Sequence, residues 1–304
     1  MKDVLVLSRT FGYGADRKQL EKLFADHYLK PYFLKEKDAL PQLDRYEGII
    51  LGTNKFTAER FARATRLKAL CKYGVGTDNI DRAAAEARGV KVLSLPGINS
   101  VAVAEMALGL MFSVARRIGE ADRSLKSGQW GQYLGSQVYG QTLGLVGTGS
   151  IGLTLARMVS GLDMTVLAHD IQPSDLLTHI GGRYVDMDDL LEQSDFISIH
   201  VPSTPQTRHL LSTDQFQKMK PTAIVINTAR GPIIDEKALY EALKTGRIAG
   251  AGLDVYETEP PLEADIIHLD NVVSTTHIAA YSRQTLRNMD RESVTRLSRA
   301  LYED

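Results

Sequence analysis

The stretch QTLGLVGTGSIG, residues 141–152, places a glycine-rich turn directly after an apolar run and before a helical pattern. Gly147 permits a tight turn, Gly149 lets the backbone approach a ligand closely, and Gly152 allows the helix to pack on the strand. The start of such a helix also offers unpaired N–H groups and a positive dipole to an anion. The stretch therefore predicts a parallel α/β domain that binds a dinucleotide pyrophosphate. A turn that serves compactness alone is the alternative.

An acidic residue stands where this type of domain requires one. Asp170 ends the next predicted strand, 170 − 149 = 21 residues after Gly149. A carboxylate at this place accepts hydrogen bonds from the adenosine ribose hydroxyls and repels a 2′-phosphate. We therefore expect NAD rather than NADP as the cofactor.

Composition excludes several classes of protein. The chain has 304 residues, 43% of them hydrophobic and 24% charged, and a net charge of −1, which argues against a disordered chain, a membrane bundle or a basic nucleic-acid surface. The apolar run 101–115 contains Glu105 and is too short to span a bilayer. Cys71 is the one cysteine, and no Cys/His cluster suggests a metal site. No signal-peptide core is present at the start, and a cytoplasmic location is expected.

Short apolar runs alternate with helical patterns along the chain, which is typical of parallel βαβ units. The polar connection 126–140 is a candidate domain boundary or interface loop, in which we expect Trp130 to act as a packing anchor. Helices are expected at about 81–88, 99–117, 151–162, 236–245 and 283–302. Strands are expected at 4–7, 48–51, 69–73, 90–95, 142–146, 165–169, 196–201, 223–227, 250–255 and 272–275.

Three later strands end at residues of the types that act in catalysis. The first ends near Arg230, the second in an acidic segment, 254–259, and the third at His277. Ligands of open α/β sheets lie beyond the carboxyl ends of the strands, so we expect these residues to converge near the cofactor. Taken singly, the arginine could be a surface charge and the histidine a packing residue.

Each of these residue types suits the oxidation of a hydroxy acid. An arginine can bind a carboxylate with two hydrogen bonds and polarise a neighbouring carbonyl group. A histidine can take the hydroxyl proton and return it in the reverse direction. A carboxylate hydrogen-bonded to the histidine would orient the ring and keep it protonated for reduction.

With these motifs in place, the chain resembles the D-isomer-specific 2-hydroxyacid dehydrogenases, a family that includes phosphoglycerate dehydrogenases and glyoxylate/hydroxypyruvate reductases. The resemblance covers most of the chain and implies an NAD-dependent oxidoreductase that interconverts a small 2-hydroxy acid, with or without a phosphate group, and its 2-keto acid. 3-Phosphoglycerate, glycerate and hydroxypyruvate are candidate substrates. The matching segments are 72–81, 96–100, 103–105, 147–152, 200–202, 227–231, 254–260 and 277–279.

The resemblance also implies residue roles. Arg230 would bind the substrate carboxylate and carbonyl, His277 would be the general acid/base, and Glu259 would support the histidine, with Glu257 as the rival carboxylate. Substrate-binding residues would be Lys72, Tyr73, Gly74, Val75, Gly76 and Asn99, of which the Gly74–Gly76 backbone would bind the carboxylate.

The same resemblance implies a set of cofactor contacts. Asp254 matches the residue that holds the nicotinamide carboxamide, and Ser150 and Ile151 match pyrophosphate contacts. The further contacts expected are Val103, Gly147, Gly149, Gly152, Asp170, Val201, Pro202, Thr207, Thr228, Ala229, Arg230, His277 and Ala279.

The family architecture implies two Rossmann-like or flavodoxin-like parallel-sheet domains with a cleft between them. Residues 1–98 plus 283–304 would form the substrate-binding domain and residues 99–282 the NAD-binding domain, and the helix after residue 99 would build a homodimer.

One departure from the family concerns the substrate. The loop 51–55 has no arginine of the kind that reaches a substrate phosphate. Lys72 or Lys55 could supply the charge or be an ordinary surface lysine.

An alternative of another class is an NAD(H)-sensing binding protein, because transcriptional corepressors share this fold and the arginine, glutamate and histidine.

Overall fold

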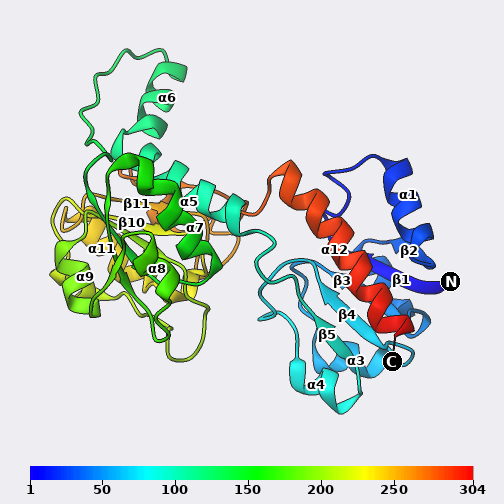
Figure 1. Ribbon diagram of the computed structural model, residues 1–304. Helices are drawn as coiled ribbons and strands as arrows, with labels where there is room; N and C mark the ends of the chain where they lie inside the picture. The colour runs from blue at the N-terminus through cyan, green and yellow to red at the C-terminus, as the bar shows by residue number, and fades with distance from the viewer. Residues whose placement is uncertain (304) are drawn as a thin grey trace. The chain divides into compact units, whose positions relative to one another are not determined.

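The computed structural model describes residues 1–303 and divides into two units (Figure 1). Unit 1 contains Met1–Asn99 and the C-terminal segment that begins at Ala280. Unit 2 is the continuous middle of the chain, Ser100–Ala279. The first unit is therefore built from two segments that are distant in sequence.

Within the described residues, unit 1 is built on a five-stranded parallel sheet of order β2-β1-β3-β4-β5. This order is that of flavodoxin-like folds. The strands are β1 (Lys2–Leu7), β2 (Leu29–Phe33), β3 (Gly48–Leu51), β4 (Ala69–Lys72) and β5 (Lys91–Leu93), and the helices are α1 (Arg17–Asp26), α2 (Glu36–Ala39), α3 (Ala58–Arg63), α4 (Arg82–Ala87) and α12 (Arg283–Tyr302).

The C-terminal helix α12 completes the core of unit 1. Its apolar side chains Leu286, Met289 and Leu297 join the buried face of the sheet that contains Val4 and Ile50. Capping residues explain where two other helices begin, because Asp16 accepts a hydrogen bond from Gln19 N and Asp81 accepts one from Ala84 N.

Unit 2 is built, within the described residues, on a seven-stranded parallel sheet of order β12-β11-β10-β9-β6-β7-β8. The strands are β6 (Thr142–Val146), β7 (Thr165–His169), β8 (Arg183–Tyr184), β9 (Phe196–Ile199), β10 (Ile224–Asn227), β11 (Gly250–Leu253) and β12 (Val272–Ser274). The helices are α5 (Ser100–Ala115), α6 (Ile118–Lys126), α7 (Ser150–Met158), α8 (Asp175–His179), α9 (Met187–Gln193), α10 (Thr213–Lys218) and α11 (Glu236–Lys244).

This order is that of a Rossmann fold, and it places the topological switch point between β6 and β9. The glycine-rich turn follows β6 at this point. The two parallel sheets confirm the predicted fold class. None of the helices in residues 1–303 is both long and apolar enough to cross a membrane.

The predicted strands 48–51, 142–146 and 165–169 are confirmed with the same bounds, whereas β2 and β8 were not predicted. The prediction for Trp130 was wrong: its side chain is 87% exposed and does not anchor the loop. Residues 126–140 also do not separate domains, because they lie inside unit 2.

Candidate active site

The three glycines of the turn after β6 differ in their surroundings. Gly147 has a φ of +100°, and a Cβ there would lie 2.9 Å from the backbone carbon of His200. A Cβ on Gly152 would lie 2.3 Å from the oxygen of Gly147, whereas one on Gly149 would meet nothing within 4 Å. The first and third glycines are therefore required by the fold, and Gly149 leaves open space in front of the turn.

Helix α7 begins at this open space. It starts at Ser150, and Gly149 precedes it without a side chain that caps the first turn. The N–H groups of the first turn thus remain available to an anion. Ser150 is exposed and Ile151 is half-buried. Together with the space at Gly149, this arrangement fits a dinucleotide pyrophosphate.

The carboxylate of Asp170, just after β7, is held against the same turn. Its Oδ2 accepts hydrogen bonds from Thr148 N at 2.6 Å and Thr148 Oγ1 at 3.0 Å, and its Oδ1 accepts one from Gln172 N at 2.9 Å. Burial alone would raise the pKa of Asp170, but these donors outweigh it and hold the pKa below its usual value. Asp170 is therefore an ionised, oriented group beside the glycine-rich turn.

The loop after β9 contains Val201, Pro202 and Thr207. Thr207 Oγ1 donates to Pro202 O at 2.7 Å and accepts from Thr204 N at 2.8 Å. Thr207, which was predicted to contact the cofactor, therefore stabilises this loop. Val201 lies close to Gly147. Burial lowers the pKa of His200 to about 4, so this histidine is neutral at physiological pH.

The turn after β10 is shaped by Asn227. Its side chain accepts a hydrogen bond from Ala229 N and donates one to Arg230 O, both at 3.0 Å. Thr228 Oγ1 is buried and has no hydrogen-bond partner among residues 1–303. A Cβ on Gly231 would lie 1.9 Å from the backbone of Tyr256, so only glycine lets this turn approach the acidic segment so closely.

The predicted histidine–carboxylate pair is formed. His277 Nδ1 lies 2.8 Å from Glu259 Oε2, and both side chains remain partly exposed. Partial burial would raise the pKa of Glu259, but the hydrogen bond and charge of His277, the Tyr256 N–H and the positive charge of Arg230 together lower it. Arg230, Glu259 and His277 thus belong to one electrostatic cluster at the carboxyl ends of neighbouring strands.

Asp254 holds the loop that carries the histidine. It is fully buried, and its two oxygens accept hydrogen bonds from Ile278 N, Ala279 N and Thr275 Oγ1 at 2.6–2.9 Å. The backbone oxygen of Asp254 also accepts from His277 N, which helps to keep His277 at its left-handed φ of 56°. Asp254 therefore positions His277 in addition to any contact with a cofactor.

The rival carboxylate has a different partner. Glu257 is hydrogen-bonded to His209 Nε2, and its N–H donates to Glu236 Oε2 at 3.0 Å. The acidic segment thus forms two separate histidine–carboxylate pairs. The geometry selects Glu259 as the partner of His277.

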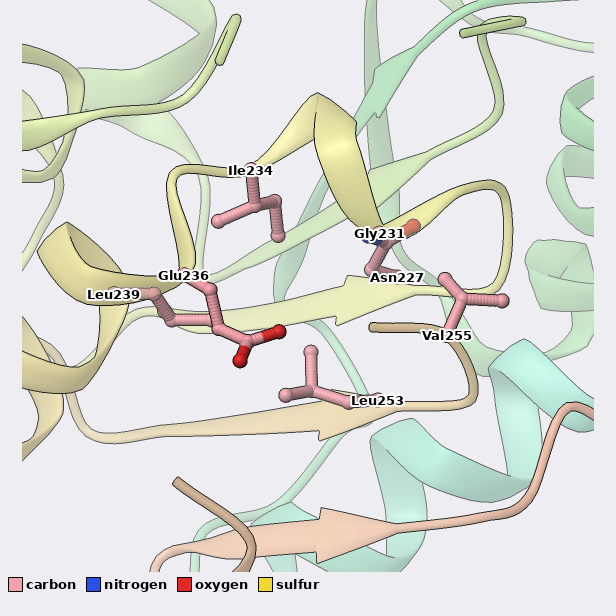
Figure 2. A pocket seen from close by; sticks show the side chains of 7 residues that line it. All are labelled: Asn227, Gly231, Ile234, Glu236, Leu239, Leu253 and Val255. Atoms are coloured by element: carbon pink, nitrogen blue, oxygen red, sulfur yellow. The ribbon is translucent and has the colours of Figure 1, made fainter. Parts of the chain in front are cut away.

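A small cavity lies behind the turn after β10. Figure 2 shows Asn227 and Gly231 where β10 ends, with Leu253 and Val255 from the chain of β11 beside them. Its volume of about 10 Å³ is sufficient for no more than one water molecule. This cavity is therefore not a substrate site.

In unit 1, the predicted substrate loop follows β4. Lys72 is 9% exposed, and its Nζ donates to Gly52 O at 2.6 Å and to Asn79 Oδ1 at 3.0 Å. The interpretation of Lys72 as a surface lysine was therefore wrong. Its ammonium group connects the ends of β3 and β4.

The two residues after Lys72 are also held by hydrogen bonds within unit 1. Tyr73 is buried, and its hydroxyl donates to Asp290 Oδ1 at 2.7 Å. Gly74 has a φ of +140°, and its oxygen accepts from Leu95 N. Val75 is exposed and Gly76 half-buried, so the centre of the loop remains accessible.

Two predicted residues lie where the units join in sequence. Asn99 ends the first segment of unit 1, and its Oδ1 is buried without a hydrogen-bond partner in the described part of the chain. Val103 lies on α5 and is buried.

Comparison with known proteins agrees with this geometry. Residues 108–279 match the NAD-binding domain of the D-isomer-specific 2-hydroxyacid dehydrogenases. The chain is 43% identical over 261 residues to a D-3-phosphoglycerate dehydrogenase of Archaeoglobus fulgidus, covering 84% of this chain and 50% of that protein. It is 39% identical over 291 residues to a hydroxypyruvate reductase of Thermotoga maritima, covering 94% and 92%.

The fold is also similar to that of a solved structure over nearly the whole of both chains. The TT0316 protein of Thermus thermophilus has a TM-score of 0.89 and 34% identity, covering 98% of this chain and 96% of that one. The aligned region thus spans about half of the phosphoglycerate dehydrogenase and nearly all of the reductase and of the solved protein.

The fold and the site define an NAD-dependent oxidoreductase that acts on 2-hydroxy acids. The chain belongs to the D-isomer-specific 2-hydroxyacid dehydrogenase family, and NAD is its cofactor. Both the archaeal and the Thermotoga relative are named as enzymes, so they give no support to the NAD(H)-sensing alternative.

Proposed function

We propose that this enzyme reduces a small 2-keto acid, such as hydroxypyruvate or glyoxylate, to the corresponding 2-hydroxy acid. The observation that carries the proposal is the His277–Glu259 pair, because Glu259 occupies Nδ1 and Nε2 is then the ring nitrogen proposed to meet the substrate. A carboxylate on Nδ1 fixes the tautomer and ring orientation that a general acid needs.

The chemistry divides among a few residues. Bound NADH supplies the hydride that reduces the carbonyl carbon. His277 Nε2 donates the proton to the carbonyl oxygen, and Glu259 stabilises the protonated ring. Arg230 binds the carboxylate and polarises the carbonyl group. Overall, one keto acid, one NADH and one proton are converted to one hydroxy acid and one NAD⁺.

The remaining site residues are proposed to bind and orient. The backbone of Gly74–Gly76 would bind the substrate carboxylate. Tyr73, which precedes this loop, and Asn99, in the next matching segment of the sequence, are proposed as further substrate-binding residues. Gly149, Ser150 and Ile151 would meet the pyrophosphate, and Asp170 the ribose. Further cofactor contacts proposed are Val103, Val201, Pro202, Thr207, Thr228, Ala229, Asp254 and Ala279.

A phosphorylated substrate is the second candidate, favoured by the similarity to D-3-phosphoglycerate dehydrogenases. Against it, Lys72 Nζ is already bonded to Gly52 O and Asn79 Oδ1, so this charge is engaged within unit 1. We therefore place the unphosphorylated acids first.

A panel assay tests the proposal. NADH oxidation is followed with glyoxylate, hydroxypyruvate, pyruvate, phosphohydroxypyruvate and phosphonopyruvate. We expect the highest kcat/KM with hydroxypyruvate or glyoxylate, and a His277→Ala variant should lose about 10²–10⁴-fold in kcat while its Kd for NADH stays within about twofold. NADH binding without turnover of any keto acid would refute an enzymatic role.

We also propose that the protein is a homodimer. Figure 1 shows α6 and the loop after it extending away from the sheet of unit 2. This segment exposes the apolar side chains Ile118, Leu125, Trp130, Leu134 and Tyr139. A soluble protein rarely exposes so many apolar groups on one segment, and a second copy of the chain would cover them.

We propose a cytoplasmic location as well. Burial raises the pKa of the Cys71 thiol to about 12, so the single cysteine is an unreactive core residue. The fold therefore does not depend on a disulfide bond within the chain, which would require an oxidising compartment. Fractionation of cells that express the tagged protein would test this.

A further inference from the structure

Four polar groups in unit 2 form a chain of hydrogen bonds that ends on Asp170. Ser174 N donates to the hydroxyl of Tyr184 at 2.8 Å, and this hydroxyl lies 2.8 Å from Thr148 Oγ1. Thr148 Oγ1 in turn donates to Asp170 Oδ2 at 3.0 Å. The chain joins the start of α8, strand β8 and the glycine-rich turn to one carboxylate.

The direction of every bond in this chain is determined by its two ends. An N–H group can only donate, and an ionised carboxylate can only accept. Each hydroxyl has one hydrogen, so Tyr184 must donate to Thr148, and Thr148 must donate to Asp170. Hydrogen bonds that point the same way polarise and strengthen one another.

The sheet explains how Tyr184 reaches the turn. Tyr184 pairs with Ala168 of β7, two residues before Asp170, and β7 lies between β8 and β6. The long tyrosine side chain crosses the end of β7 to reach Thr148, which follows β6 and is buried. A shorter side chain on β8 could not form this link.

We propose that Tyr184 and Thr148 are positioning residues that lock the Asp170 carboxylate in one orientation and thereby set the preference for NAD over NADP. The inference rests on the proposed contact between Asp170 and the ribose. A fixed negative charge excludes a 2′-phosphate, whereas a carboxylate free to rotate can turn away from it. The bond to Ser174 N also restrains the segment 171–174, which follows the carboxylate directly.

The experiment compares Tyr184→Phe and Thr148→Val, which remove hydroxyl groups and keep the side-chain volume nearly unchanged. Tyr240→Phe, on α11 and next to Lys244, is the matched control. The Kd values for NADH and NADPH are measured by fluorescence titration, and kcat/KM is measured with each cofactor.

We expect the NADH/NADPH preference to fall about two- to thirteenfold in both variants, because one hydrogen bond contributes about 0.5–1.5 kcal/mol. The kcat of Tyr184→Phe with NADH should stay within about twofold. The double variant should lose no more preference than either single variant, because the two hydroxyls act as one chain. The control should keep the wild-type ratio.

Asp170→Ala separates the two possible failures. If Asp170→Ala abolishes the preference while Tyr184→Phe keeps it, the positioning role is wrong and the proposed ribose contact stands. If Asp170→Ala keeps the preference, the ribose contact itself fails. An equal rise in both Kd values in Tyr184→Phe would show a merely structural role and would also overturn the inference.

Discussion

His277 Nδ1 lies 2.8 Å from Glu259 Oε2, so the neighbouring strands β11 and β12 lead into a joined acid–base pair. Three further contacts surround this pair. Asp254 O accepts a hydrogen bond from His277 N, and Tyr256 N donates to the other oxygen of Glu259. Gly231 lets the turn that carries Arg230 pack closely against the backbone of Tyr256. The proton-transfer geometry is therefore present in unit 2 by itself.

Glu259→Gln should lower kcat for reduction by about 10²-fold, because the amide keeps the shape but no longer stabilises a protonated His277. Steady-state rates between pH 5 and 9 would measure this.

Glu257→Gln is the matched control for that prediction, since Glu257 has the same chemistry but pairs with His209. Its kcat should stay within about twofold of wild type. A larger loss in Glu257→Gln than in Glu259→Gln would reverse the assignment of the supporting carboxylate.

Asp290→Asn should stabilise unit 1 at neutral pH. Asp290 is 2% exposed, and burial raises its pKa to about 6, although the Tyr73 hydroxyl and Gly12 N–H partly oppose this. The folded-state pKa lies above the unfolded value of about 3.9, so the contribution of Asp290 to stability is fully present below pH 4 and is lost as the pH rises through about 6.

The asparagine variant mimics the protonated acid and should lack this decline, with a gain of about 1–3 kcal/mol at pH 7. Urea unfolding from pH 4 to 8 measures it, with the exposed Asp44→Asn as control. Identical pH profiles for wild type and Asp290→Asn would contradict the prediction.

Gly149→Ala and Gly152→Ala should separate binding from folding. A methyl group at Gly149 meets open space, so the melting temperature should not change, while NADH binding weakens at least about tenfold because the pyrophosphate is kept away. Gly152→Ala places a methyl group 2.3 Å from Gly147 O and should cost about 1–3 kcal/mol of stability. Thermal melts and NADH titrations of both variants would show whether the two effects divide in this way.

The proposed dimer surface can be tested at its exposed residues. Trp130 is 87% and Leu134 92% exposed, so Trp130→Ser combined with Leu134→Ser should shift the mass in solution toward the monomer and leave the fold intact. Analytical ultracentrifugation would measure the mass. A wild-type protein that is monomeric at micromolar concentration would remove the basis for the proposal.

Local patterns predicted the parts of the protein that depend on local physics. The glycine turn, the apolar strands such as β6, and the strand-end positions of Arg230 and His277 follow from spacing and chain direction. The choice between Glu257 and Glu259 needed the resemblance to the family, because both carboxylates lie within three residues and only the three-dimensional path of the loop separates them.

The missed features depend on contacts between distant residues. Tyr73 and Asp290 are separated by 217 positions, and Tyr184 and Thr148 by 36, so neither pair leaves a periodic signal. One interpretation placed Lys72 at the surface because lysines are rarely buried, but its ammonium group donates to the carbonyl of Gly52 and to the side chain of Asn79. β8 has two residues, too few for a recognisable pattern.

The return of α12 to the first sheet has a consequence for biosynthesis. The strands of unit 1 leave the ribosome first, but the helix that covers one of their faces, Arg283–Tyr302, is made last. At about 5–20 residues per second, translation of Ser100–Ala279 takes roughly 10–40 s. During this time the apolar face of the first sheet lacks the helix that packs on it. We therefore expect unit 2 to fold before unit 1, and a released chain truncated after Ala279 should resist protease in its middle but not in its first hundred residues.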